Sequence, residues 1–185
     1  LPKNKVVGMA GILDSSRFIY FLSKELNVPV GKIKSFVLGG HGDSMVAMIG
    51  STEVEGKKIT DLINDGKLSR EKLNQIVDRT KKGGAEIVKY LEKGSAFYAP
   101  AASGVEMAEC YLKDLKKQLP CAVYLNGEYG TKDIYAGVPV IIGSQGVEKI
   151  VELELTAEEM SNFKKSVQAV KELFDAAKKI DTELK

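Results

Sequence analysis

The closing stretch of the chain, residues 156–177, constrains the fold more than any other segment. Thr156 and Glu159 have the spacing of a capping box, in which two side chains pair with backbone N–H groups at a helix start. Apolar residues then recur at intervals of three and four: Met160, Phe163, Val167, Val170, Phe174 and Ala177. The pattern predicts a long amphipathic helix whose apolar stripe packs on a core or on another subunit. We assign this stripe no cofactor role.

Strand-like and helical segments alternate irregularly before this helix. β-branched residues next to glycine turns predict strands, and apolar residues spaced by four predict helices. We expect strands at 5–11, 33–40, 45–56, 120–130 and 136–153, the last two forming a β-meander. We expect helices from about Asp14 to Leu26, over 69–94 and over 99–118. Because no regular β-α-β-α series is present, the predicted class is α+β, with long helices packed on antiparallel sheets.

A pair of glycines, Gly83 and Gly84, interrupts the helical pattern of residues 69–94. Each glycine costs a helix about 1 kcal/mol relative to alanine. One interpretation is a break between two helices. The other is a kink that bends the second part of the helix over a functional site, and the sequence alone does not choose between them.

Composition narrows the class of protein. The 185 residues are 44% hydrophobic and 28% charged, as in soluble globular proteins. The 27 basic and 25 acidic residues are dispersed, so we expect no nucleic-acid partner. Apolar runs such as 138–142 are far shorter than the roughly 20 residues of a membrane span, so no membrane association is expected. Cys110 and Cys121 form no CxxC pair or disulfide framework, which favours ordinary, partly buried thiols in a cytoplasmic protein.

Three absences limit the chemistry that the sequence can carry by itself. No GxGxxG motif follows a strand and no GxxxxGK[ST] motif occurs, so the chain offers no backbone cradle for nucleotide phosphates. A single histidine without a cysteine or carboxylate cluster predicts no metal site.

The chain begins at Leu1 rather than at a methionine, which favours a fragment or a processed start.

His41, Asp14 and Arg17 form the candidate site. A histidine can take and give a proton near neutral pH, and a carboxylate such as Asp14 would fix its tautomer and favour its charged form. Arg17, three residues after Asp14, could bind a substrate carboxylate in a bidentate pair. The set predicts proton transfer at a carbon next to a carboxylate. The residues alone leave a structural alternative open: a partly buried histidine, and a helix N-cap with a surface ion pair.

Two motifs resemble the lactate/malate dehydrogenase family. They are VVGMAGILDSSRF at 6–18 and VLGGHGDSMV at 37–46, and KGSAFYAPAASGVEMAECYLKD at 93–114 and the closing helix extend the similarity over the chain. The resemblance implies that residues 1–185 are a substrate-binding and catalytic C-terminal domain, similar in fold to that of this family. It also implies that an N-terminal, NAD-binding Rossmann domain is absent from the chain.

The resemblance assigns roles to individual residues. His41 would be the acid and base, Asp14 would orient it, and Arg17 would bind the C1 carboxylate of malate or oxaloacetate. Ala96 would lie near the substrate, and Met9 and Pro100 would line the nicotinamide of NAD, although each of the three could serve packing alone. NAD itself would be held mainly by the absent domain, so the isolated chain is expected to lack turnover.

The resemblance to the family leaves open which substrate the protein converts and how its subunits assemble. Gly40, Met45 and the GSAFYAP segment are similar to malate-converting members, which points to a homo-oligomeric enzyme of the tricarboxylic acid cycle. Ala47 departs from the proline that is usual after MV, which concerns loop stiffness rather than chemistry. A lactate or other 2-hydroxyacid dehydrogenase is an alternative, because the mobile loop that reads the second carboxylate is absent. A non-catalytic oligomerisation module is an alternative of another class.

Overall fold

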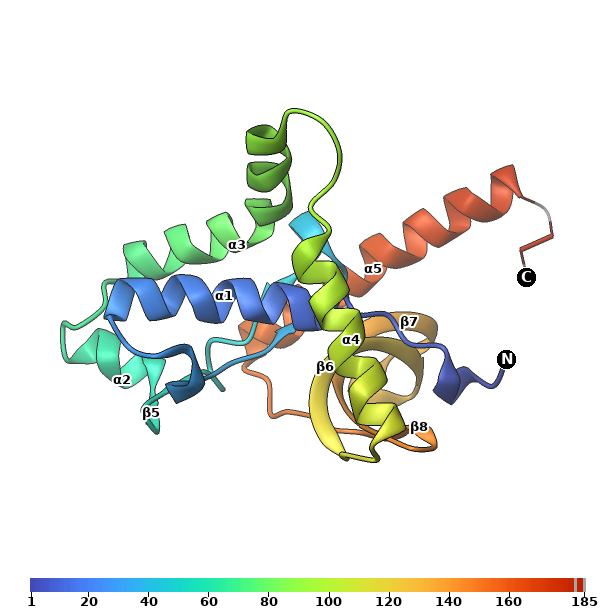
Figure 1. Cartoon of the computed structure of the whole chain (residues 1–185), viewed down its shortest axis with the longest axis horizontal. Helices are drawn as coiled ribbons and strands as arrows, with labels where there is room; N and C mark the ends of the chain where they lie inside the picture. The colour runs from blue at the N-terminus through green and yellow to red at the C-terminus, as the bar shows by residue number, and fades with distance from the viewer. Residues whose placement is uncertain (182, 185) are drawn as a thin grey trace.

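The protein has the predicted α+β architecture (Figure 1). The structure is a computed structural model that describes residues 1–181, 183 and 184. Its α-helices are α1 (Ala10–Leu26), α2 (Ile59–Asn64), α3 (Arg70–Leu91), α4 (Tyr98–Leu112) and α5 (Ala157–Ile180). Its strands are β1 (Ile33–Lys34), β2 (Val37–Leu38), β3 (Val46–Ala47), β4 (Glu53–Val54), β5 (Lys57–Lys58), β6 (Lys117–Asn126), β7 (Lys132–Gly143) and β8 (Gly146–Ile150). Short 3-10 turns are η1 (Lys3–Lys5), η2 (Val30–Lys32), η3 (Gly42–Ser44) and η4 (Glu128–Gly130).

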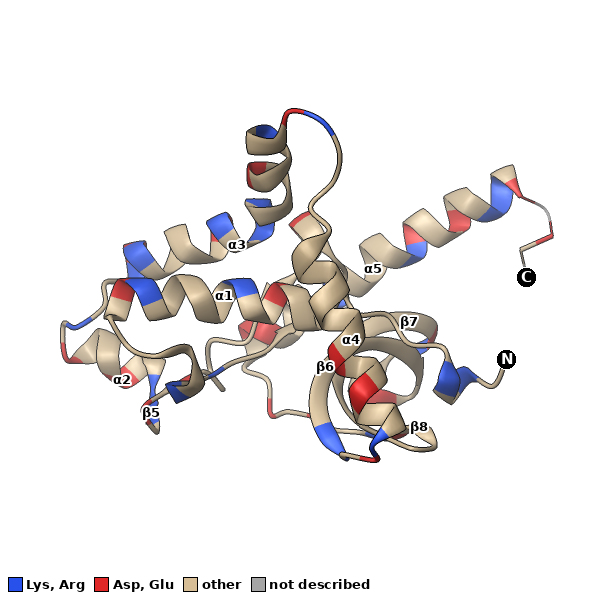
Figure 2. Cartoon of the chain, in the orientation of Figure 1, with Lys and Arg blue, Asp and Glu red and all other residues tan. Residues whose placement is uncertain are grey.

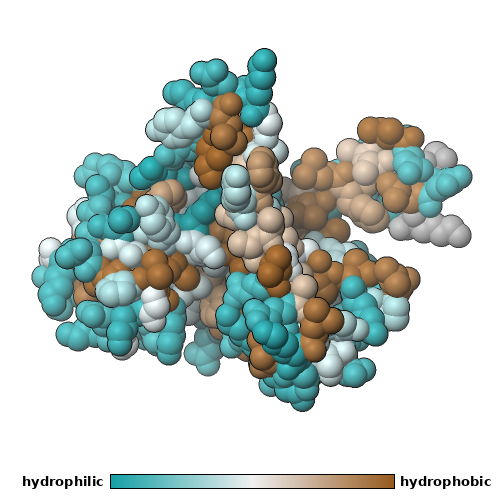
Figure 3. All heavy atoms as spheres, in the orientation of Figure 1, coloured by the Kyte–Doolittle hydropathy of each residue, from teal (hydrophilic) through white to brown (hydrophobic). Residues whose placement is uncertain are grey.

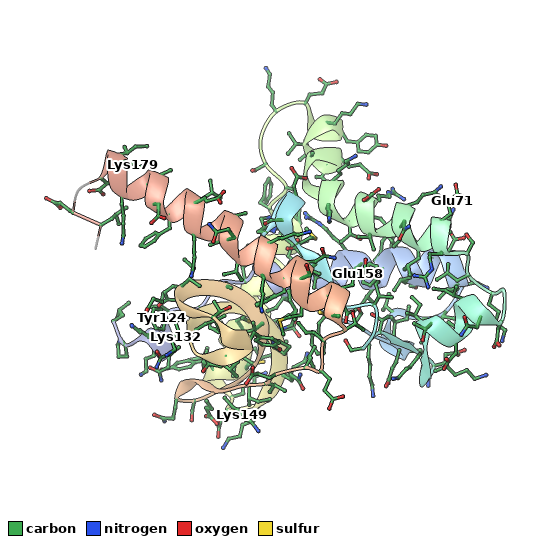
Figure 4. The ribbon with its side chains drawn as sticks, turned by 180° about the vertical axis from the view of Figure 1, so that it is seen from behind. Glu71, Tyr124, Lys132, Lys149, Glu158 and Lys179 are labelled. Carbon is green, nitrogen blue, oxygen red and sulfur yellow. The ribbon has the colours of Figure 1, made fainter. Side chains whose placement is uncertain are left out.

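The main sheet is the antiparallel meander β6-β7-β8, as the sequence predicted. Its two long strands pair from Lys117 with Ile142 to Asn126 with Lys132. Figures 1 and 4 view the molecule from opposite sides, with α4 in front of the sheet in one and α5 in front in the other. The two helices therefore cover opposite sides of this sheet. The other strands are two-residue ladders in two small sheets, β1-β4-β5 and β2-β3.

Helix α5 begins as its sequence predicted and anchors one side of the sheet. The Thr156 hydroxyl accepts a hydrogen bond from the Glu159 N–H, and the Glu159 carboxylate accepts one from the Thr156 N–H. Phe163 is fully buried and its ring packs against Tyr129. Figure 4 shows Glu158 near the start of α5 and Lys179 near its end, where each charge complements the helix dipole.

Helix α1 joins the two hydrophobic clusters of the molecule. Ile12, near its start, belongs to the cluster under the main sheet, which includes Val138 and Phe163. Phe18 and Leu22 belong to the cluster formed with the small strands, α2 and α3. Asp14 and Arg17 lie on α1 between these contacts, so burial of the apolar side chains fixes where the two charged residues lie.

The predicted strand at 5–11 is wrong, and α1 starts earlier than predicted. Only Gly8 makes a bridge, with Ala122, and the helix begins at Ala10 rather than near Asp14. A Cβ on Gly11 would lie 2.5 Å from the Pro120 carbonyl oxygen, so the glycine lets the first turn of α1 pack directly on β6. The sequence pattern could not show this long-range contact. The end of α1 was predicted correctly, because Asn27 takes the left-handed conformation there.

Two other element predictions also need correction. The strands expected at 33–40 and 45–56 are short ladders separated by turns, because the chain bends around the His41 loop. The helix expected at 99–118 ends at Leu112, and residues 117–118 belong to β6.

Helix α3 runs without a break from Arg70 to Leu91, and Figure 1 shows that it bends so that its last turns lead away from α1. The structure therefore shows a bent helix rather than a break between two helices, and the idea that the bent part covers a functional site stays a prediction. Arg79 and Glu86 form a bidentate ion pair along this helix, with nitrogen–oxygen distances of 3.0 and 2.7 Å. Gly83 and Gly84 lie between them, in the part of α3 that faces Arg17 of α1.

Residues of both charge signs are interspersed along α1, α3 and α5 (Figure 2). Over the part of the chain that the structure describes, no helix is both long enough and apolar enough to cross a membrane. The described residues likewise contain no cluster of three or more histidine, cysteine, aspartate or glutamate side chains suited to a metal ion. Cys110 and Cys121 are free thiols and are more deeply buried than the sequence predicted, and burial raises the pKa of Cys121 to about 12.

Candidate active site

Asp14 lies one turn inside α1 and is 1% exposed. A carboxylate at this depth requires partners, because a buried charge is costly without them. The packing of α1 on β6 through Gly11 holds it there. Its Oδ2 atom accepts a hydrogen bond from His41, whereas its Oδ1 atom has no hydrogen-bond partner among the described residues.

His41 lies in the loop between β2 and η3, and its backbone is fixed by contacts from two distant elements. Gly39 pairs with Gly137 of β7 through two hydrogen bonds of 2.8 Å. The Gly40 N–H donates to the Ser166 hydroxyl of α5, also at 2.8 Å. A Cβ on Gly39 would lie 2.4 Å from that hydroxyl oxygen, so a larger residue would push the loop off α5.

The glycines around His41 serve two different purposes. From the sequence alone, glycines on both sides of His41 are expected to let a substrate approach the loop backbone closely. Gly40 instead packs on the protein itself, since a Cβ there would lie 2.4 Å from the Ser44 hydroxyl oxygen. Gly42 has a φ of +76° and open space beside it, so only this glycine fits that expectation.

The imidazole of His41 donates from Nδ1 to Asp14 Oδ2 over 2.8 Å. A carboxylate can only accept, so this contact places a proton on Nδ1 and leaves Nε2 for another partner. The hydrogen bond to Asp14 raises the pKa of His41 above 6.5, with the negative charge of Asp14 adding to it. Burial and the positive charge of Arg17 act in the opposite direction. The side chain is 53% exposed, so a substrate can reach it.

Arg17 lies on the other side of the same carboxylate. Its Nη1 atom is 3.8 Å from Asp14 Oδ1, which makes a charge contact but no hydrogen bond. The side chain is 12% exposed, so the guanidinium is held largely out of water. The structure thus brings His41, Asp14 and Arg17 together, with the carboxylate in contact with both basic side chains.

A cavity of about 180 Å³ adjoins Asp14 and His41. It is lined by the start of α1, the glycine loop, Tyr135 and Ala136 of β7, and Val170 of α5. Over the described residues its lining does not include Met9, Ala96 or Pro100. Met9 is the N-cap of α1, Ala96 lies in the connection between α3 and α4, and Pro100 lies in the first turn of α4, all three half-buried. Their predicted roles remain predictions.

Sequence reasoning missed three residues that support the site. Ser15 is buried and accepts a hydrogen bond from the Val37 N–H, which ties α1 to β2. Ser166 holds Gly40, as described above, and Gly83 packs against the side chain of Arg17. Ser166 carried a weak signal, because it is a polar residue beside Val167 on the apolar stripe of α5. Ser15 and Gly83 act through contacts between elements, which the sequence pattern does not reveal.

The α+β fold that carries these residues is that of a known class of dehydrogenase domains. A family model described as lactate/malate dehydrogenase, alpha/beta C-terminal domain, matches residues 12–180. The chain belongs to this family, which confirms the resemblance seen in the sequence.

Individual relatives give the same assignment. A malate dehydrogenase of Pelagibacter ubique (strain HTCC1062) is 65% identical over 184 residues, covering 100% of this chain and 58% of the relative. The crystal structure of Cryptosporidium parvum malate dehydrogenase has a TM-score of 0.93 and 44% identity, covering 96% of this chain and 57% of that one. Lactate dehydrogenase of Eimeria maxima, with NADH and oxamate, has a TM-score of 0.94 and 40% identity, covering 98% and 57%. The chain thus spans less than two thirds of each of these relatives.

Proposed function

We propose that this chain is the substrate-binding and catalytic half of an NAD-dependent malate dehydrogenase, which interconverts malate and oxaloacetate. The hydrogen bond of 2.8 Å between His41 and the buried Asp14 carries the proposal, because it prepares an acid and base next to an arginine. The relative with 65% identity, a malate dehydrogenase, supports the choice of substrate.

Proton transfer is the task of His41. In malate oxidation its Nε2 atom accepts the proton of the C2 hydroxyl, while the C2 hydrogen leaves as hydride with the electron pair of its bond. In oxaloacetate reduction the protonated ring returns that proton to the ketone oxygen as hydride arrives at C2. A group whose pKa lies near neutral pH suits both directions. NAD, when bound, supplies the hydride acceptor.

Asp14 and Arg17 have complementary tasks in this scheme. Asp14 fixes the Nδ1-protonated tautomer and stabilises the imidazolium that malate oxidation produces. Arg17 pairs its planar guanidinium with the C1 carboxylate of the substrate, which places C2 beside His41 Nε2. Because Arg17 forms no hydrogen bond with Asp14 Oδ1, that contact does not occupy its donors.

The residues present fit the reacting end of NAD and not its phosphates. Met9 and Pro100 are apolar, half-buried and able to contact a nicotinamide ring, and Ala96 is a candidate for substrate contact. The sequence has no glycine-rich phosphate loop. We therefore place the rest of the NAD site in an N-terminal Rossmann domain outside this chain, and we expect the isolated chain to lack turnover.

Lactate, or another 2-hydroxyacid, is a second candidate substrate. Malate and lactate dehydrogenases of Cryptosporidium parvum are each 44% identical to this chain, with TM-scores of 0.93 and 0.91. The three central residues handle the hydroxyl and the C1 carboxylate, which both substrates share. Selection between malate and lactate would depend on the protein group that contacts the part of the substrate beyond C2, where the two molecules differ.

A non-catalytic assembly module is the candidate of another class. Apolar and aromatic side chains are exposed along α4, including Tyr98 at 83%, Val105 at 66% and Leu112 at 78%. Hydrophobic surface is visible over this helix in Figure 3. Such a patch fits contact with another subunit, so we include a homo-oligomer in the proposal.

The deciding experiment compares the full-length parent chain with the isolated 185-residue chain. Each is assayed for NADH oxidation with oxaloacetate and with pyruvate. We expect the parent to prefer oxaloacetate and the isolated chain to show no turnover. A parent that prefers pyruvate would support the lactate candidate, inactivity of a folded parent with both substrates would favour the assembly module, and turnover by the isolated chain would contradict the division of the site.

A further inference from the structure

Arg17 lies along a glycine surface of α3. A Cβ built on Gly83 would lie 3.0 Å from Arg17 Cδ and 3.3 Å from its Nε. These distances are tighter than ordinary carbon contacts, and Gly83 is buried against α1. Any side chain at this position would meet the stem of the arginine just before its charged end.

The contact with Gly83 matters because the nearby carboxylate does not fix Arg17 by itself. Asp14 Oδ1 is 3.8 Å from Nη1 and accepts no hydrogen bond from the described residues. The direction of the guanidinium is therefore set largely by what packs against its aliphatic stem. The backbone of α3 at Gly83 is one surface that the stem meets.

The backbone of α3 does not itself call for a glycine at this position. Neither Gly83 nor Gly84 has a positive φ, and both lie inside a helix, where glycine is disfavoured relative to alanine. The two positions differ in their surroundings. A Cβ on Gly84 would lie 3.7 Å from Arg17 Nη1, an ordinary van der Waals distance.

We propose that Gly83 is a positioning residue for substrate binding: its missing side chain lets Arg17 lie flat on α3 and aim its guanidinium at the substrate carboxylate. This inference rests on the proposed function, in which Arg17 binds that carboxylate. An alanine at position 83 would push Cδ and Nε of Arg17 outward by a few tenths of an ångström. The planar bidentate pair would lose its alignment, whereas the proton-transferring pair of His41 and Asp14 would stay in place.

The kinetic test uses Gly83→Ala in the full-length parent, with Gly84→Ala as the matched control. Gly83→Ala should raise KM for oxaloacetate about tenfold with little change in kcat, because small misplacements of a substrate-positioning group are costly. The dissociation constant of NADH should not change. Gly84→Ala should leave all three values near wild type. Equal KM values for the two variants would overturn the proposal.

Arg17→Lys separates this proposal from the proposed function. If the lysine variant binds oxaloacetate as well as the wild type does, the role of Arg17 itself is wrong. If the lysine variant binds weakly and Gly83→Ala binds normally, only the role of Gly83 is wrong.

A double-mutant cycle measured by thermal unfolding provides a second test if Gly83→Ala folds poorly. Thermal unfolding is measured for Gly83→Ala in the wild-type parent and in an Arg17→Ala parent. We expect alanine at 83 to stabilise the helix only where Arg17 has been removed, since the steric conflict is then absent. Equal effects in the two backgrounds, including failure of both to fold, would show that Gly83 does not act through Arg17.

Discussion

The carboxylate of Asp14 accepts a hydrogen bond from the His41 ring over 2.8 Å, and Arg17 lies 3.8 Å from the other oxygen of the same carboxylate. One buried carboxylate therefore contacts two basic side chains that come from different elements. Its position depends on α1, whose first turn packs on β6, and on a loop that α5 and β7 hold in place. Kinetic measurements below use the proposed full-length parent, and stability measurements use the 185-residue chain.

His41→Asn should lower turnover by about three orders of magnitude, since an amide cannot exchange a proton near neutral pH. NADH affinity should remain close to wild type, because His41 acts on the substrate side of the site. Steady-state rates and NADH fluorescence titration measure the two quantities. Wild-type turnover in this variant would remove His41 from its proposed role.

Asp14→Asn should move the pH dependence to lower pH. Asp14 raises the pKa of His41 above 6.5, so wild-type oxaloacetate reduction, which needs the protonated ring, persists above that pH and declines through the raised pKa. Malate oxidation needs the neutral ring and rises over the same interval. Without the carboxylate both limbs should shift downward in profiles of kcat/KM against pH. Unshifted limbs would show that Asp14 does not set this titration.

The raised pKa of His41 also predicts how the stability of the fold changes with pH. Because the folded-state pKa of His41 is raised, its ion pair stabilises the fold fully below pH 6.5 and loses that contribution as pH rises through the raised value. Urea unfolding of the wild type and of His41→Asn, measured at several pH values, checks the sign. The difference in unfolding free energy between the two proteins should shrink with rising pH.

Arg17→Lys should mainly raise KM for oxaloacetate, because an ammonium cannot form the bidentate pair of a guanidinium. A factor of about 10 to 100 corresponds to the loss of one strong, charge-assisted hydrogen bond. Initial rates over a range of oxaloacetate concentrations give KM and kcat separately. Unchanged kinetics would exclude Arg17 as the carboxylate clamp.

Gly11→Ala should destabilise the fold by about 1–3 kcal/mol, the usual cost of overpacking a filled core. Its Cβ would lie 2.5 Å from the Pro120 backbone oxygen, which cannot yield as a flexible side chain would. Gly104→Ala in α4 is the matched control, since nothing lies within 4 Å of a Cβ there and helix propensity favours alanine by about 1 kcal/mol. Urea unfolding should show a lower free energy of unfolding for Gly11→Ala and a higher one for Gly104→Ala. Equal changes in the two variants would contradict the packing argument.

Local chemistry explains what could be predicted from the sequence. Thr156 and Glu159 start α5 by their own hydrogen bonds, and Asn27 ends α1 by adopting a left-handed conformation. These interactions involve residues close together in the chain, so the residue types alone predict them. The motifs around Asp14 and His41 also identified the candidate site and the family before any geometry was known.

Contacts between distant segments decided the rest. The sequence placed the start of α1 near Asp14, but the packing of Gly11 on Pro120 extends the helix back to Ala10 and buries Asp14 in it. The Gly83-Gly84 pair left a break and a kink both open, and the unbroken, bent course of α3 decided between them. By itself the sequence determined which chemical groups are available and which helix ends they favour. The tertiary structure alone decided how they meet, because that depends on packing between residues far apart in the chain.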